Sequence, residues 1–174
     1  MNKTNLLLAH GWGMNSRVWG PSLSLLESRF EVQTVDLPGH GRNAQQPATT
    51  TLQDWADAVI AQAAAPAIYI GWSLGGLAAL TAAQRQPQRV RGLILVASSP
   101  KFAQSPDWPH AIKPELLYKF ETALRGDYRQ LLEDFILLQS MGASKVRDEA
   151  RWLRKSLQAG GEPAPWALKA GLEF

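Results

Sequence analysis

The stretch IYIGWSLGGLAAL, residues 68–80, decides the fold because the sequence changes at a single serine from a strand pattern to a helix pattern. The apolar run at 67–70 does not alternate with polar residues, which predicts a strand buried on both faces. The run of small and apolar residues at 74–86 is ended by Pro87 and predicts a helix. The turn between them, Gly71-Trp72-Ser73-Leu74-Gly75, has the pattern G-x-S-x-G, which in this context predicts a serine nucleophile.

The physical reason for such a turn is that a serine hydroxyl is a poor nucleophile unless a base and hydrogen-bond donors surround it. Gly71 and Gly75 allow the backbone to pass closely where a side chain would clash. Ser73 would then stand at the carboxyl edge of the sheet, where open α/β folds bind their ligands. The backbone N–H of Leu74, at the start of the helix, is a candidate oxyanion donor. The alternative is a glycine-rich loop that carries an incidental serine.

A second oxyanion donor is predicted after the first strand, at 6–9, where His10-Gly11-Trp12-Gly13 forms a loop. This is the loop that an oxyanion hole of this kind needs opposite the nucleophile. We expect the N–H of Trp12 to be the donor and its indole to form a wall of the acyl pocket, although the ring could instead only fill the core. His10 is interpreted as a structural residue of this loop.

Strand and helix patterns alternate through the first hundred residues, which predicts an α/β fold with a mostly parallel sheet covered on both faces. The predicted strands are 6–9, 31–37, 67–70 and 91–97, and the predicted helices are 17–28, 52–64 and 74–86. After Pro100 the pattern changes to three helices, predicted at 114–125, 128–141 and 145–158 with Asp127 and Ser144 as N-caps. We therefore expect a core at 1–100 and a helical lid at 101–174.

Composition excludes several classes of protein. The chain has 174 residues, 45% of them hydrophobic, which suits one globular domain with a sizeable core. No apolar run approaches the ~18 residues of a membrane span, and the first ten residues lack a signal-peptide core, so a cytoplasmic location is expected. The absence of cysteine rules out disulfides and a thiolate nucleophile. The net charge of +3 is mild and suggests no nucleic acid partner, and no metal or cofactor motif is visible.

Four segments in order, HGWGMNSRVW, VDLPGHGR, GWSLGG and LILVASSP, resemble the α/β-hydrolase superfamily. The segments GWSLGGL, VASSP, LLQSMG and VRDEAR are similar to those of the pimeloyl-[acyl-carrier-protein] methyl ester esterases of biotin synthesis, the BioH family. This resemblance runs from Leu6 to about Phe174. It implies a serine esterase that hydrolyses the methyl ester of a pimeloyl chain on acyl carrier protein, without a cofactor. A generic short-chain carboxylesterase and a non-catalytic module that binds acyl chains or acyl carrier protein remain alternatives.

The resemblance implies that His40 lies in a structural turn and is a loop residue, not a ligand. It also implies roles for residues of the lid. Phe135 and Gln139 would contact the substrate, with ordinary helix packing as the alternative. Arg147 and Arg151 would contact acyl carrier protein, an acidic partner. Between Lys145 and Lys155 five basic and two acidic residues give a local charge of +3, although most charged helix faces are merely solvated.

Hydrolases of this fold carry an Asp and then a His after the nucleophile. The only histidine after Ser73 is His110, with Asp107 three residues before it, and both precede the lid. We do not expect this pair to form a working dyad. The resemblance places both residues of the triad on strands after the lid, so we expect an incomplete hydrolase and little turnover from these 174 residues alone.

Overall fold

A four-stranded parallel sheet organises the protein, in a computed structural model that describes residues 3–174. The sheet order is β2-β1-β3-β4, and all three neighbouring pairs are parallel. The strands are β1 (Thr4–Ala9), β2 (Phe30–Val35), β3 (Ala67–Trp72) and β4 (Val90–Val96). The α/β fold with a parallel sheet is therefore confirmed.

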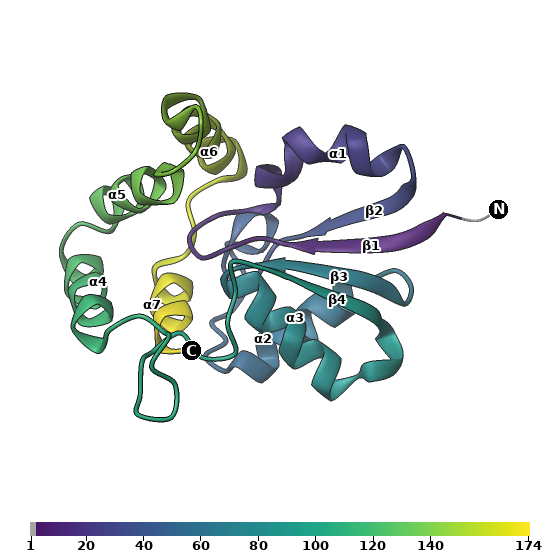
Figure 1. Cartoon of the computed structure of the whole chain (residues 1–174), viewed down its shortest axis with the longest axis horizontal. Coiled ribbons are helices and arrows are strands. Elements are labelled where there is room, and N and C mark those ends of the chain that lie inside the picture. Colours follow the sequence, from purple (N-terminus) through teal and green to yellow (C-terminus); the bar gives the residue numbers. More distant parts are fainter. Residues whose placement is uncertain (1–2) are drawn as a thin grey trace.

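Three helices cover the two faces of the sheet, and four more gather at the carboxyl ends of its strands (Figure 1). The covering helices are α1 (Gly20–Glu27) on one face and α2 (Leu52–Gln62) and α3 (Leu74–Arg85) on the other. The remaining helices are α4 (Pro114–Gly126), α5 (Tyr128–Ser140), α6 (Val146–Gly160) and α7 (Pro165–Glu173). Within residues 3–174 no helix is long and apolar enough to cross a membrane.

The helix α2 shows why the sequence folds in this way. Trp55, Val59 and Ile60 recur at helical spacing and are buried against the core. Thr51 caps the helix, because its hydroxyl accepts a hydrogen bond from the Asp54 N–H at 3.1 Å. The predicted helix and its cap are confirmed, although α2 ends two residues earlier than expected.

The structure differs from the prediction at several helix ends. Residues 16–19 form a short 3₁₀ turn and α1 begins at Gly20, where a single helix over 17–28 was expected. Pro21 explains the break, because it has no N–H to donate to the preceding turn. Asp127 caps α5 as predicted, accepting from two backbone N–H groups, but Lys145, and not Ser144, is the N-cap of α6.

The prediction missed α7, the last helix. Its nine residues are few for a stable isolated helix, so its pattern carries a weak signal. Tertiary packing stabilises it: Ala167, Leu168 and Ala170 are buried, and the ring of Trp166 packs edge-to-face on Trp55. Within the region predicted as the lid, at least this helix packs on the core.

The strand β4 exposes several apolar side chains. It lies at an edge of the sheet with β3 as its neighbour. Ile94, Leu95 and Val96 expose 48%, 39% and 42% of their surface. These side chains alternate between the two faces, so both faces of the strand and its open edge present apolar surface and unpaired backbone groups.

We expect this edge to drive self-association of the 174-residue chain. Replacing Ile94 and Val96 with Lys places two charges on the exposed edge strand and should lower the apparent mass at high concentration. Light scattering over a concentration series measures the effect. Leu25→Lys is the control, because Leu25 is a 73% exposed apolar residue of α1, which packs on β2 at the opposite edge of the sheet from β4. An equal change in both variants would contradict pairing through β4.

Candidate active site

The turn at Ser73 has an unusual backbone conformation. Ser73 lies between β3 and α3 with φ 53° and ψ −121°. A side chain in this region costs of order 1–3 kcal/mol and persists only where the surroundings hold it. Here the Ser73 N–H donates to the Val96 carbonyl at 2.9 Å, and the Ser73 carbonyl accepts from the Gly76 N–H at 2.9 Å. The turn therefore stores strain at the residue that the sequence pattern predicts to be the nucleophile.

The glycines around Ser73 are required by close backbone approach. A Cβ at Gly71 would overlap the Cα of Gly76 across the turn, and a Cβ at Gly75 would overlap the His10 carbonyl oxygen at the end of β1. The prediction that these two glycines leave room for backbone is confirmed. Their absence of side chains lets the first turn of α3 sit directly against β1 and β3.

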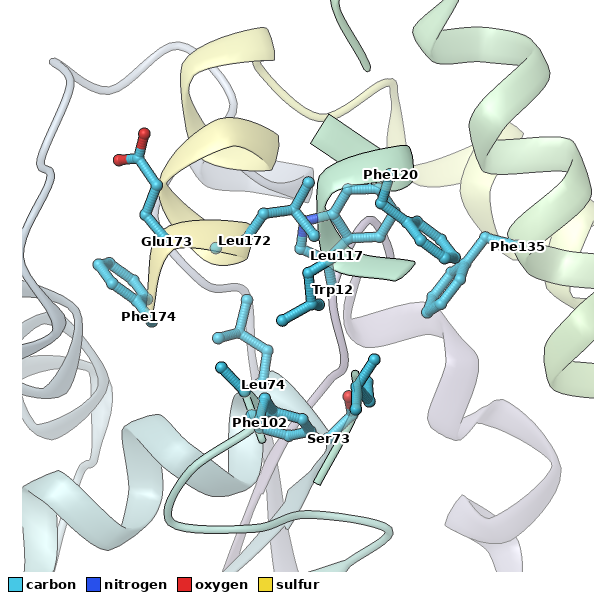
Figure 2. Close-up of a pocket in the computed structure, with 13 residues that line it drawn as sticks. Trp12, Ser73, Leu74, Phe102, Leu117, Phe120, Phe135, Leu172, Glu173 and Phe174 are labelled. Atoms are coloured by element: carbon cyan, nitrogen blue, oxygen red, sulfur yellow. The ribbon is translucent and has the colours of Figure 1, made fainter. Parts of the chain in front are cut away.

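A half-open pocket of about 180 Å³ lies above Ser73 (Figure 2). Among the described residues of its wall, only Ser73, Glu173 and the indole of Trp12 carry polar side-chain atoms. The wall consists of Trp12, Ser73, Leu74, Phe102, Ala103, Ile112, Leu117, Phe120, Phe135, Gly171, Leu172, Glu173 and Phe174. Such a surface favours an apolar chain and offers few groups for a polar ligand.

Trp12, in the loop after β1, and Leu74, at the start of α3, both line this pocket. Trp12 is 4% exposed, and its indole Nε1 donates to the Leu168 carbonyl at 2.9 Å, so the ring is both packed in the core and part of the wall. Leu74 is the first residue of α3, and the first four N–H groups of a helix have no acceptor within it. The Leu74 N–H is therefore free of the helix ladder, beside Ser73.

The helix α7 covers Trp12 and Leu74. A Cβ at Gly171 would lie 2.7 Å from a methyl of Leu74 and 2.8 Å from the Trp12 ring, so the helix backbone rests directly on both side chains. Sequence reasoning missed the three residues that follow, Leu172, Glu173 and Phe174, all of which line the pocket. No local motif marks them, because only the return of α7 to the core brings them there.

Phe135 joins the pocket from α5, and Gln139 does not line it. The Phe135 ring packs edge-to-face on Trp12 at 5.1 Å and on Phe120 at 5.9 Å, which connects the loop after β1 with α4 and α5. Leu138, one turn further along α5, is 50% exposed. Phe120 was not predicted, since an apolar residue of an amphipathic helix has no signal that separates a pocket wall from ordinary packing.

His10 and His40 are buried and occupied by backbone contacts. His10 Nε2 accepts from the Leu37 N–H at 3.0 Å, and its Nδ1 lies 2.8 Å from the Gly11 carbonyl, a pattern that fits the neutral ring with its proton on Nδ1. His40 packs on His10 at 5.2 Å and on Trp55. Burial lowers the pKa of His10 to about 4 and that of His40 to about 3. Both rings are structural, as the sequence suggested.

His110 and Asp107 lie in the exposed loop before α4. Asp107 accepts from the Ser105 hydroxyl at 2.5 Å and from Lys101 at 3.3 Å, so its partners lie within the loop. None of the three histidines within residues 3–174 lines the pocket of Ser73. In the same range, no cluster of three or more His, Asp or Glu residues is arranged to hold a metal ion.

The helix α6 presents one basic face to solvent and packs its other face on the core. Arg147, Arg151 and Lys155 are exposed. Arg154, which neighbours them in sequence, is instead paired with Glu133 of α5 at 2.5 Å. The packed side is fixed by the Asn15 side chain, whose amide donates to the Ser156 carbonyl at 3.0 Å. The predicted basic stripe is therefore a solvent-exposed surface.

Comparison with known proteins defines the class of this protein. The model of the α/β hydrolase fold family matches residues 4–155, and the chain therefore belongs to this family. An esterase from Exiguobacterium antarcticum has the same fold, with a TM-score of 0.79 at 19% identity over 98% of this chain and 65% of that one.

Two relatives are far closer in sequence. A pimeloyl-[acyl-carrier protein] methyl ester esterase of Xanthomonas oryzae pv. oryzae is 45% identical over 169 residues, which is 97% of this chain and 66% of that protein. The enzyme of the same name from Klebsiella pneumoniae is 43% identical over 170 residues, covering 98% of this chain and 65% of that one. The chain thus spans just under two thirds of the length of these relatives.

The buried histidines predict a loss of stability in mild acid. Above pH 6.5 both rings are neutral in the folded and in the unfolded state. Below pH 6.5 the histidines of the unfolded chain become protonated. In the folded chain, protonation begins only near the lowered pKa values, about 4 for His10 and about 3 for His40. The free energy of unfolding should therefore fall by a few kcal/mol, roughly, as the pH drops from 6.5 towards 4.

Urea unfolding across this range measures the pH dependence. His40→Gln should flatten the slope of stability against pH whatever it does to the stability at pH 7. His110→Gln is the matched control and should leave the slope unchanged, because its side chain is exposed. If the stability of the parent and of His40→Gln depends on pH with the same slope, His40 does not contribute to the loss of stability in acid.

Proposed function

We propose that the full-length protein is a serine carboxylesterase that hydrolyses the methyl ester of pimeloyl-[acyl-carrier protein]. The observation that carries this proposal is the strained Ser73 turn opening into an almost wholly apolar pocket. The names of the relatives at 43–45% identity give the substrate class. A pimeloyl ester is a run of methylene groups with a neutral end, which suits a wall of this composition.

In the proposed reaction, Ser73 Oγ attacks the ester carbonyl and the carbonyl oxygen becomes an oxyanion. The N–H groups of Leu74 and Trp12 donate to that oxyanion, while Phe135 and the indole of Trp12 contact the acyl chain. Methanol leaves, and water hydrolyses the acyl-enzyme to the free carboxylate. The Ser73 proton needs a base, and since no histidine of residues 3–174 lines the pocket, the reaction is tested in the full-length gene product.

The proposed partner is acyl carrier protein, and its contact surface is the exposed face of α6. Arg147 and Arg151 lie one helical turn apart and neither is buried, so both are free to meet an acidic surface. Arg151 makes one weak contact with Asp148, at 3.4 Å, on the exposed side of the helix. Surface charges of one sign mainly accelerate association, and salt screens them. A cytoplasmic location remains part of this proposal.

Ser73→Ala tests the nucleophile. Losing the nucleophile of a serine hydrolase costs on the order of 10⁴ to 10⁶ in turnover, so hydrolysis of p-nitrophenyl esters and of pimeloyl methyl ester should vanish. Labelling by a fluorophosphonate probe, located by mass spectrometry, should disappear as well. Activity near the parent rate would refute the role of Ser73. A parent that binds acyl chains without labelling or turnover would instead support the non-catalytic alternative.

Reversing charge on α6 tests the partner. Arg147→Glu with Arg151→Glu should lower kcat/KM for the carrier-bound ester, most strongly at low salt, and leave a small free ester almost unchanged. The matched control is Arg29→Glu with Arg91→Glu, which makes the same charge change at exposed positions near the amino ends of β2 and β4. Equal losses on both substrates would mean that the arginines of α6 support the fold and do not contact a carrier.

A further inference from the structure

We propose that Ser98 is a positioning residue that aims the Leu74 N–H into the pocket by holding the Ser73 carbonyl. The inference deepens the proposed function and rests on it. Its basis is a hydrogen bond across the end of the sheet: the Ser98 hydroxyl donates to the Ser73 carbonyl at 2.7 Å.

The end of β4 and the residues just after it hold Ser73 at two points. The Val96 carbonyl accepts the Ser73 N–H at 2.9 Å, and two residues later the Ser98 hydroxyl donates to the Ser73 carbonyl. Between them Ala97 has a positive φ of 45°, rare for a residue with a side chain. That kink lets a backbone acceptor and a side-chain donor reach the same residue. The strained backbone at Ala97 therefore helps to hold the strained backbone at Ser73, whose N–H and C=O are both fixed by hydrogen bonds.

The consequence for Leu74 follows from peptide geometry. The Ser73 carbonyl and the Leu74 N–H belong to one planar peptide unit, in which the trans arrangement points them in opposite directions. A donor that fixes the carbonyl thus fixes the direction of the N–H. Leu74 lines the pocket beside Ser73, and its N–H has no acceptor in the helix. A hydrogen bond to the carbonyl also polarises the peptide unit and strengthens the N–H as a donor.

The bond comes from outside the helix, which separates it from ordinary helix capping. The Ser73 carbonyl already accepts from the Gly76 and Leu77 N–H groups, at 2.9 and 3.3 Å, and these bonds hold it along the axis of α3. Ser98 adds a constraint from the neighbouring strand. Gly76 makes the approach possible, because a Cβ there would overlap the Ser98 hydroxyl.

The test compares three variants of the full-length protein. Ser98→Ala removes the donor, and Ser98→Cys keeps only a weak one. Ser99→Ala is the matched control, since the neighbouring Ser99 hydroxyl donates to the Lys101 carbonyl and not to the turn. Removing an oxyanion donor costs about 10²–10³ in kcat, so loosening its aim should lower kcat by about tenfold in Ser98→Ala. The loss should be smaller in Ser98→Cys and absent in Ser99→Ala, with KM unchanged in all three.

A purely structural role would lower thermal stability without this split between kcat and KM. Unchanged kcat in a folded Ser98→Ala protein overturns the proposal, as does a loss that falls on KM. If Ser98→Ala does not fold, the graded effect in Ser98→Cys decides.

A measurement independent of activity separates this proposal from the proposed function. In the 174-residue chain, the ¹³C shift of the Ser73 carbonyl and the amide proton shift of Leu74 should both move in Ser98→Ala and stay in place in Ser99→Ala. If both chemical shifts are unchanged in Ser98→Ala, the positioning role of Ser98 is overturned. A third outcome is that the shifts change in Ser98→Ala but the full-length protein hydrolyses no ester. That outcome refutes the proposed function and the catalytic effect of the hydrogen bond. It leaves intact the conclusion that Ser98 fixes the orientation of the peptide unit.

Discussion

The backbone of Ser73 is the constraint on which the rest of the site depends. A side chain at φ 53° is strained, and only neighbours that hold both sides of the residue keep it there. Those neighbours come from the end of β4 and from the first turn of α3. The order β2-β1-β3-β4 places β4 directly beside β3, so the sheet topology itself supplies the groups that fix the turn.

The pocket depends on the same turn and on packing from elements distant in sequence. Phe135 rests on Trp12, and Gly171 of α7 lies on both Trp12 and Leu74. The loop after β1 is thus held from below by the core and from above by two helices. An oxyanion donor loses value rapidly when its direction is uncertain, so this rigidity is what the proposed reaction requires.

Charge is distributed so that the buried histidines stay neutral while the basic residues of α6 lie at the surface. The two buried histidines are kept uncharged by burial and are used in backbone hydrogen bonds around the loops that follow β1 and β2. The basic residues of α6 stay exposed on the opposite side from its anchor at Asn15. The apolar pocket can therefore bind an acyl chain while the charged outer surface binds an acidic carrier. The charged groups need not lose their solvation when the acyl chain enters the pocket.

The sequence by itself determined the parallel α/β fold, the strand–serine–helix turn and the glycines around it, because these follow from local periodicity and from steric limits on one residue. It also predicted α4, α5 and α6 to within a few residues. Only the tertiary structure decided that α7 returns to the core, that Phe120 and Leu172 line the pocket while Gln139 does not, and that Ser98 reaches the Ser73 carbonyl. These contacts join segments far apart in the chain. Their side chains are ordinary apolar residues or a serine, so nothing local distinguishes them until packing brings the segments together.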